Sequence, residues 1–182
     1  MKFIFTLLYF IYNNAYAVDN FRLESDIGIM SHKYGTLIVA YNNNYRIQLQ
    51  EPYYLDPYYL EHSTWNPKLT HEGIILYNKA KKSCIKYEGA RVPYASTCDI
   101  NNLGNVDNLD SYTFRRIPST QGSFLLQFKN TELCLFARWV GSLYYPFVVT
   151  CPKLNDDVDM GFLWSFVPKV GHSFAAQPLS IN

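Results

Sequence analysis

The pattern of hydrophobic and polar residues along the chain is that of β-strands. Residues 36–41 form a β-branched, apolar run, and residues 45–50 alternate apolar and polar side chains with a period of two. The asparagines at 42–44 between them have the composition of a turn. Residues 124–128 and 147–151 are two further predicted strands. Because no segment keeps a helical period between recognisable caps, the pattern predicts an all-β fold.

These strands recur with a period of about fifty residues. The strand start at Ile74 aligns with Phe124, and Cys84 aligns with Cys134, at a separation of 50 residues in both cases. An earlier copy without cysteines spans about 27–65. Each copy ends on an aromatic residue shortly before a turn, and these repeat aromatics are Trp65, Phe114 and Trp164. Three copies of this kind predict a single β-trefoil in which the repeat aromatics converge in the core.

The first 17 residues have the composition of a secretory signal peptide. Lys2 is followed by an apolar stretch from Phe3 to Ile11, and the small-x-small triplet Ala15-Tyr16-Ala17 forms a cleavage site. The stretch is too short for a membrane-spanning helix, which needs roughly 20 apolar residues. We therefore expect secretion of the protein, with residues 1–17 removed and a mature chain that begins at Val18.

Four cysteines follow in the predicted mature chain: Cys84, Cys98, Cys134 and Cys151. In a secreted protein an even number implies disulfides, and four cysteines allow three connectivities. The separations of 14 and 17 residues, and the position of each pair within one copy, favour Cys84–Cys98 and Cys134–Cys151. Loops of this size contribute about 3 kcal/mol each in the chain-entropy model. A zinc site is disfavoured, because the sequence has no CxxC pair and no histidine at ligand spacing.

Charge and length narrow the class of protein further. The chain has 182 residues, of which 16 are basic and 15 acidic. Removal of the signal peptide takes away one basic residue and leaves 165 residues with a net charge of zero. A balanced charge argues against nucleic-acid binding, which needs a basic surplus. The remaining length suits one domain, and we expect the β-trefoil to span 18–170, followed by an extended tail at 171–182.

Catalytic and metal-binding motifs are weak. The chain has no HExxH, GxSxG or phosphate-binding motif around its four histidines, which are His32, His62, His71 and His172. The acidic segment 156–161 has some likeness to a calcium loop but lacks the terminal glutamate. We therefore expect the protein not to be an enzyme and to bind neither a cofactor nor a metal.

Aromatic clusters are the candidates for a binding surface, because tyrosine and tryptophan give a large amphipathic contact area with little rotamer entropy. The candidates are Tyr53, Tyr54, Tyr58, Tyr59, Trp139, Tyr144 and Tyr145. For the tyrosines at 53–59, ordinary packing against the first copy is an equal alternative. Two matches to a cholesterol-binding pattern, at 37–46 and 109–115, are better explained by strand alternation. The lysines between 79 and 86 are interpreted as a solvated turn, and attraction to acidic membrane or glycan surfaces is the alternative.

One run of residues resembles a known family. Residues 113–125, Thr-Phe-Arg-Arg-Ile-Pro-Ser-Thr-Gln-Gly-Ser-Phe-Leu, resemble the Phe-x-x-Ile-Pro-Thr-x-x-Gly-x-Phe-Leu run of the ricin-type β-trefoil subunits of cytolethal distending toxin. The four cysteines and the run from Trp164 to Pro168 fall where that family has them. The family has two trefoil types, A and C, and the resemblance is greatest for the C-type. It covers 74–168 well and the first copy loosely.

The resemblance implies a non-catalytic role in a secreted bacterial genotoxin of three subunits. Together with the A-type trefoil, such a chain binds the host cell surface through a glycan, a glycoprotein or a cholesterol-rich membrane. It delivers the third component, a nuclease resembling DNase I, and does not bind nucleic acid directly. Phe21 and Phe174, isolated on the two predicted tails, are the candidates for docking to the A-type trefoil and the nuclease. Folding of the tails back onto the trefoil is the alternative.

The chain departs from the sugar-binding members of this family. Their repeats carry Gln-x-Trp near the end of each copy and an Asp shortly after the first cysteine. Here the glutamine positions hold Ser63, Tyr112 and Phe162, and no Asp follows Cys84 or Cys134 closely. Galactose binding in the usual pocket is therefore not expected. A stand-alone secreted R-type lectin and a trefoil-type protease inhibitor are the alternative functions.

Overall fold

The computed structural model describes residues 25–41, 46–102, 108–119, 122–153 and 157–169. Within these residues the chain forms twelve strands and a few short helical turns. The strands are β1 (Ile27–Ser31), β2 (Leu37–Ala40), β3 (Ile47–Gln50), β4 (Asn66–Thr70), β5 (Gly73–Asn78), β6 (Ser83–Lys86), β7 (Tyr94–Thr97), β8 (Thr113–Pro118), β9 (Phe124–Phe128), β10 (Leu133–Val140), β11 (Leu143–Thr150) and β12 (Trp164–Pro168). The helical segments are η1 (Pro52–Tyr54), α2 (Pro57–His62), η3 (Leu109–Tyr112) and η4 (Met160–Phe162).

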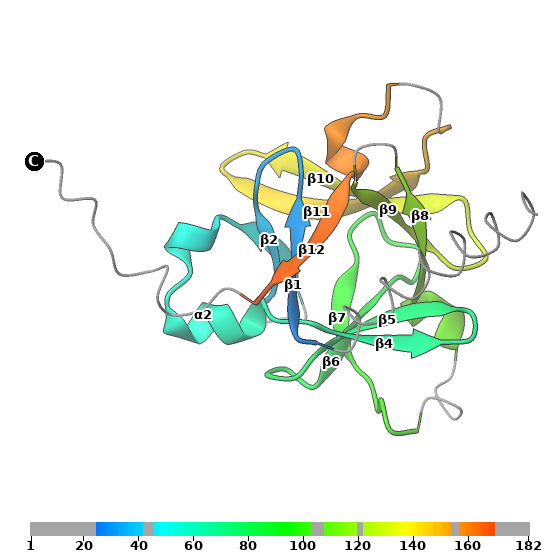
Figure 1. Cartoon of the computed structure of the whole chain (residues 1–182), viewed down its shortest axis with the longest axis horizontal. Helices are drawn as coiled ribbons and strands as arrows, with labels where there is room; N and C mark the ends of the chain where they lie inside the picture. Colours follow the sequence, from blue (N-terminus) through cyan, green and yellow to red (C-terminus); the bar gives the residue numbers. More distant parts are fainter. Residues whose placement is uncertain (1–24, 42–45, 103–107, 120–121, 154–156, 170–182) are drawn as a thin grey trace, which may run out of the picture.

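Seven of the strands form one closed circuit of antiparallel pairs. Antiparallel pairing runs from β9 through β10, β11, β3, β2, β1 and β12 and returns to β9. The other strands continue from β9 through β8, β5, β6 and β7, and β4 also pairs with β5. Figure 1 shows β1, β2 and β12 side by side, which brings the beginning and the end of the described chain together. A closed circuit leaves no open edge among its members, so this part of the sheet has a rigid, self-contained form.

One large hydrophobic cluster fills the interior. All three repeat aromatics belong to it, and none of them is exposed to solvent. The ring of Phe114 packs on that of Phe128, with 4.4 Å between the centroids. Smaller satellite clusters surround Cys84 and Cys134. Because burial of each large apolar side chain contributes roughly 1.5–3 kcal/mol, the central cluster is the main source of stability.

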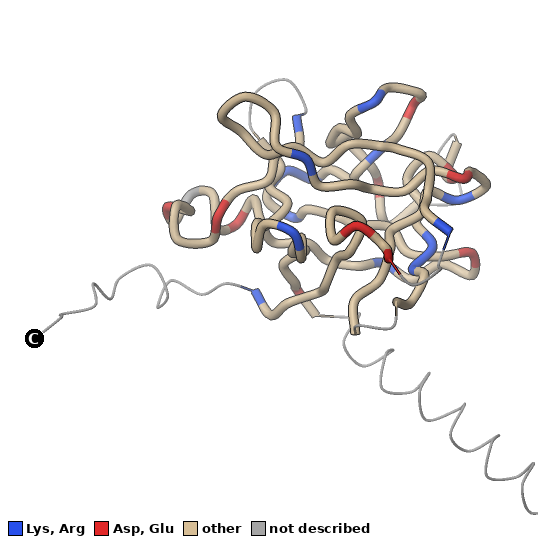
Figure 2. The backbone as a smooth tube through the Cα atoms, turned by 90° about the horizontal axis from the view of Figure 1, so that it is seen from above, with Lys and Arg blue, Asp and Glu red and all other residues tan. Residues whose placement is uncertain are grey.

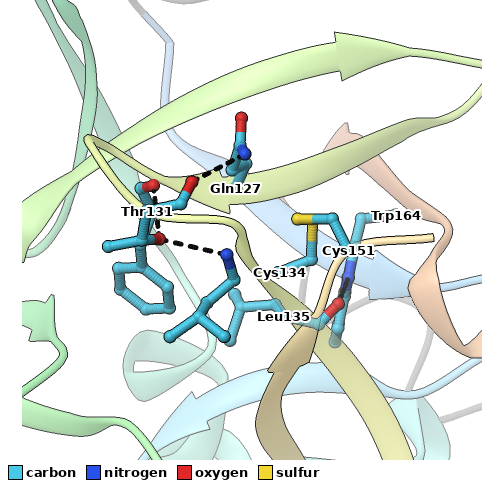
Figure 3. Close-up of a disulfide and its surroundings, with 8 residues drawn as sticks. Gln127, Thr131, Cys134, Leu135, Cys151 and Trp164 are labelled. Atoms are coloured by element: carbon cyan, nitrogen blue, oxygen red, sulfur yellow. Dashed lines mark hydrogen bonds between the residues drawn. A yellow bond between two sulfur atoms is a disulfide. The ribbon is translucent and has the colours of Figure 1, made fainter. Parts of the chain in front are cut away.

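Two of the repeat aromatics make equivalent hydrogen bonds. The indole N–H of Trp65 donates to the carbonyl of Ile38 on β2 at 2.9 Å. The indole N–H of Trp164 donates to the carbonyl of Leu135 on β10 at 3.1 Å (Figure 3). Phe114 carries no N–H group, so the middle copy has no such bond. The first and third copies thus repeat the same link between the final aromatic and an earlier strand.

Most of the predicted strands are confirmed. The segments 36–41 and 45–50 contain β2 and β3, and 124–128 forms β9 as predicted. The predicted strand at 147–151 is wrong at its start, because β11 begins at Leu143. The first residues of β11 pair with the end of β10, so the β10–β11 hairpin is longer than the sequence pattern predicted.

The chain also contains one short helix, α2, that the sequence pattern did not reveal. Asp56 caps this helix by accepting a hydrogen bond from the Tyr59 backbone N–H at 2.9 Å, and Pro57 occupies the first turn. The helix has six residues, which is too short to display a helical period, and it buries Leu60 in a cluster with Leu37. In the part of the chain that the structure describes, no helix is long and apolar enough to cross a membrane.

Both predicted disulfides are present. The Cα atoms of Cys84 and Cys98 are 5.8 Å apart, and those of Cys134 and Cys151 are 4.9 Å apart. Figure 3 shows the second disulfide. Cys134 lies near the start of β10 and Cys151 directly follows β11, so this disulfide closes the base of the β10–β11 hairpin.

We expect Trp164→Phe to lower the free energy of unfolding by about 1–3 kcal/mol, because it removes the donor to the Leu135 carbonyl and leaves a void in a packed core. Urea denaturation of the oxidised protein measures the change. Trp139→Phe, at a side chain that is 47% exposed, is the matched control and should cost less than about 0.5 kcal/mol. Equal costs for the two substitutions would contradict the role given to Trp164.

Candidate binding surface

The β10–β11 hairpin carries three of the aromatic candidates. A two-residue turn, Gly141-Ser142, joins its strands, and Gly141 has a φ of 65°, which glycine adopts without strain. The pairing places Trp139 opposite Tyr144, and Arg138 opposite Tyr145. Figure 1 shows the hairpin in yellow, with its turn at the periphery of the molecule.

Trp139 and Tyr144 form an aromatic surface together with Tyr34 from the β1–β2 turn. The ring centroid of Tyr144 lies 4.4 Å from that of Trp139 and 4.7 Å from that of Tyr34. Lys33 Nζ lies 5.8 Å from the Tyr34 centroid and 5.5 Å from the Phe136 centroid, within cation–π range. We call Tyr34, Trp139 and Tyr144 the aromatic platform.

The neighbouring side chains of the hairpin are also apolar. Val140 and Leu143, which pair next to the turn, are 45% and 40% exposed. Tyr145 is half-buried, and the guanidinium of Arg138 lies 5.7 Å from the centroid of Phe147. The tip of the hairpin therefore carries exposed apolar side chains on the face opposite the platform as well.

The second tyrosine cluster divides into two groups. Tyr53 and Tyr54, on η1, are 67% and 69% exposed, and their ring centroids are 4.1 Å apart. Tyr59, on α2, instead stacks on Tyr41 at 5.1 Å. The side chain of Tyr58 lies outside the described residues. The segment thus has one exposed pair of tyrosines, whereas Tyr59 packs against the protein.

A polar pocket of about 320 Å³ lies between the end of the middle copy and the β9–β10 turn. Lys129, 7% exposed, donates hydrogen bonds to Glu72 and Asp110, and Asn130 donates to the other oxygen of Asp110 at 2.6 Å. The hydrogen bond from Lys129 holds the pKa of Asp110 below its usual range. Tyr87 also lines the pocket. The sequence did not reveal this site, since the two partners of Lys129 lie 57 and 19 residues away.

The positions of the usual ricin-type sugar pocket are taken by side chains engaged in local contacts. Lys86, two residues after Cys84, pairs with Glu88 and lies 5.0 Å from the ring centroid of Tyr112. Phe136, two residues after Cys134, packs on Phe162 at 4.7 Å. Neither Lys86 nor Phe136 can accept hydrogen bonds from sugar hydroxyls as an aspartate does.

Charged side chains near the other candidate motifs pair locally. Lys79, in the lysine cluster, pairs with Asp26 at 2.8 Å. Asp159, in the acidic segment, accepts hydrogen bonds from the Gly161 N–H at 2.8 Å and from Lys33 at 3.0 Å, which hold its pKa below the usual range. Figure 2 shows basic and acidic residues interspersed over the surface. Among the described residues, no group of three or more His, Cys, Asp or Glu is placed to hold a metal.

His62 is a buried titratable group at the end of α2. Its ring lies 6.1 Å from that of Tyr59. Burial, together with the nearby positive charge of Lys81, lowers the pKa of His62 below its usual value.

The two predicted docking residues, Phe21 and Phe174, lie outside the described residues, as does the predicted signal peptide.

Comparisons with known proteins place the fold. No protein-family model matches the chain, and no curated protein matches it in sequence. Cytolethal distending toxin chains from Actinobacillus actinomycetemcomitans and Haemophilus ducreyi both match with a TM-score of 0.63, at 14% and 12% identity. The matches cover 88% of this chain in each case, and 98% and 90% of the respective toxin chains.

Two further matches broaden the picture. The ricin B-like lectin of Macrolepiota procera, solved with lactose, matches with a TM-score of 0.58 at 13% identity, over 80% of this chain and 96% of that chain. An endo-β-galactosidase from Clostridium perfringens matches at 0.61 and 10% identity, over 79% of this chain, but this chain spans only 32% of that enzyme. At these identities the likeness concerns the fold, which this chain shares with toxin chains and ricin B-like proteins.

We expect the stability of the protein to fall as the pH drops from 7 to 5, in part because of His62. The folded chain binds a proton at His62 less readily than the unfolded chain, whose histidines titrate near 6.5, so stability present above that pH is lost below it. His62→Gln should flatten this part of the curve, measured as urea midpoints at pH 7, 6 and 5. His71→Gln, at a side chain that is 87% exposed, is the control, and a slope equally flattened by both variants would contradict the assignment.

Proposed function

We propose that this chain is a secreted, non-catalytic binding component of a three-chain toxin of the cytolethal distending type. The observation that carries the proposal is the fold likeness to two such toxins, which spans 90% and 98% of the matched chains. The sequence run at 113–125 and the spacing of the four cysteines support it independently, because they match motifs of the C-type trefoil. In this proposal the body is a β-trefoil, which is supported by the equivalent indole hydrogen bonds of Trp65 and Trp164.

A delivery component needs two contact surfaces, one for the host cell and one for the other toxin chains. We assign the aromatic platform and the adjoining hairpin tip to the host cell surface. We assign the exposed pair Tyr53 and Tyr54 to the other toxin chains, because a compact aromatic pair provides the central anchor that protein interfaces use. The chain performs no chemistry in this role, and the nuclease of the complex acts after delivery.

A secreted lectin is the second candidate, favoured by the polar pocket. Lys129 and Asn130 fix the carboxylate of Asp110, and Tyr87 lines the same pocket. A fixed carboxylate, an amide and an aromatic ring are the groups that bind sugar hydroxyls and the apolar face of a sugar ring. Likeness to a lectin solved with lactose is in keeping with this alternative.

We expect the mature chain to form a complex with the nuclease and second trefoil proteins of its source when the three are coexpressed. Size-exclusion chromatography should show one species that contains all three chains, and the isolated chain should leave supercoiled DNA intact. Tyr53→Ser combined with Tyr54→Ser should weaken assembly by about tenfold or more, since exposed aromatic anchors dominate such interfaces. Trp139→Ser, at an exposed aromatic residue on the other proposed surface, is the matched control.

The outcome that contradicts the toxin role is a chain that elutes alone in all mixtures and is not needed for binding of the nuclease to cells. Binding of the isolated chain to immobilised lactose, lost in Asp110→Asn and kept in Asp157→Asn, would favour the lectin instead.

A further inference from the structure

We propose that the tip of the β10–β11 hairpin, residues 139–144, inserts into the interfacial region of an anionic lipid bilayer. This inference rests on the proposed function and deepens it, since a toxin component that binds host cells works at a membrane surface. It assigns a partner to the hairpin tip and leaves the Tyr53–Tyr54 pair to the other toxin chains.

Both faces of the tip are apolar. A surface hairpin of a globular protein normally packs one face on the core and presents a polar face to water. Here Trp139 and Tyr144 form one pair, and Val140 and Leu143 form the next pair, which points to the opposite face. Trp139, Val140 and Leu143 are 47%, 45% and 40% exposed. Tyr144 packs against Tyr34 and the central cluster, so Trp139 is the side chain that a partner can cover on its face, and Val140 and Leu143 are open on the other. Contact with a sugar or a flat protein surface covers one of these faces, whereas a bilayer around the tip covers both.

The side chains follow the order of a bilayer interface. The aliphatic pair Val140–Leu143 is next to the turn, the aromatic pair Trp139–Tyr144 follows, and the pair Arg138–Tyr145 comes third. In membranes, aliphatic groups enter the acyl boundary, tryptophan and tyrosine favour the headgroup level, and arginine contacts lipid phosphates. At a rise of roughly 3.4 Å per residue, the two outer pairs reach about 7 Å beyond Arg138. Interfacial elements are buried to a similar depth of roughly 5–10 Å.

The backbone and the charge of the hairpin are both suited to insertion. Strand pairing continues as far as Val140 and Leu143, so the inward peptide groups of the two strands are paired with each other, and the outward groups can bond to water and lipid headgroups at the interfacial level. Residues 133–151 contain no Asp or Glu, and Arg138 is their one charged residue. The hairpin itself therefore presents a cation and no carboxylate to anionic headgroups.

The hairpin tip is a different site from the two segments that match the cholesterol pattern. Leu37 and Tyr112, in those segments, are 1% and 5% exposed, and both pack within the protein. The ligand inferred for the tip is the bilayer interface itself, and no sterol pocket is required.

The chain contains its own probe for the experiment. Of its three tryptophans, Trp65 and Trp164 are fully buried, so Trp139 is the one that lipid can reach. The mature protein is titrated with vesicles of phosphatidylcholine alone, and with vesicles in which about 30% of the lipid is phosphatidylserine. We expect binding to the anionic vesicles, a blue shift of the emission and quenching by lipids brominated on the upper acyl chain. Trp139→Phe should remove the quenching and keep the binding.

Val140→Thr combined with Leu143→Gln removes the aliphatic tip while keeping its size. This variant should lower the vesicle partition coefficient by at least about tenfold, because two exposed apolar side chains lose their transfer free energy. Tyr53→Ser combined with Tyr54→Ser is the matched control and should bind vesicles as the wild type does. Unchanged emission from Trp65 and Trp164, together with an unchanged circular dichroism spectrum, shows that the variants are folded.

Three results would overturn the inference. These are no binding to anionic vesicles, binding without quenching of Trp139, and equal binding by the tip variant and the wild type. If the tip variant instead loses assembly with the other toxin chains and neither form binds vesicles, the hairpin is a protein-docking element and the lipid assignment is wrong. If the protein does not bind lipid but the three-chain complex still forms, the membrane inference is wrong and the proposed toxin function is retained. If the three-chain complex does not form but the protein binds lipid, the proposed toxin function is wrong and the membrane contact is retained.

Discussion

A ring of seven strands can close only if the space inside it is filled, and in this chain the repeat aromatics fill that space. Trp65, Phe114 and Trp164 belong to a single buried cluster, although they lie about fifty residues apart in the sequence. Two of them also hydrogen-bond to a carbonyl of an earlier strand of their own copy. The position of each indole and the position of that strand are therefore fixed together. A smaller side chain would leave both a cavity and an unpaired buried carbonyl, and each of these raises the free energy of the fold.

The indole hydrogen bond of Trp164 also helps to explain how the protein can carry an apolar hairpin at its surface. Strand β10 is held at its base by the Cys134–Cys151 disulfide and, one residue further on, by the indole bond from Trp164 to the Leu135 carbonyl. Towards its far end the strand is held by pairing with β11 up to the turn, and β11 is itself held where Tyr144 pairs with Leu49 and packs against the central cluster. Exposed apolar groups at Val140 and Leu143 are unfavourable in water. The rigidity of the base lets the fold tolerate them without rearranging to bury the tip.

The sequence predicted the parts of the fold that rest on local pattern and on spacing. The alternation that forms β3, the cysteine separations and the fifty-residue recurrence all survive in the structure. Helix α2 was missed because a six-residue helix has no visible period, although Asp56 followed by Pro57 is a recognisable start signal. The Lys129 pocket could not be predicted from the sequence. A lysine followed by an asparagine has the pattern of a solvated turn, and only the fold places Glu72 and Asp110 beside it. Of the aromatic candidates, only tertiary structure could separate exposed Tyr53 from packed Tyr59.

The third copy shows how a single aromatic side chain is held at the base of the hairpin. Phe136 stands where sugar-binding repeats of the resembled family place an aspartate, and its ring packs on Phe162. A Cβ on Gly161 would lie 2.4 Å from this ring, so a larger residue there would require the ring to move. The ring stands on β10 two residues before Arg138, at the base of the apolar tip. Phe136 thus both stands in place of that aspartate and packs at the base of the hairpin.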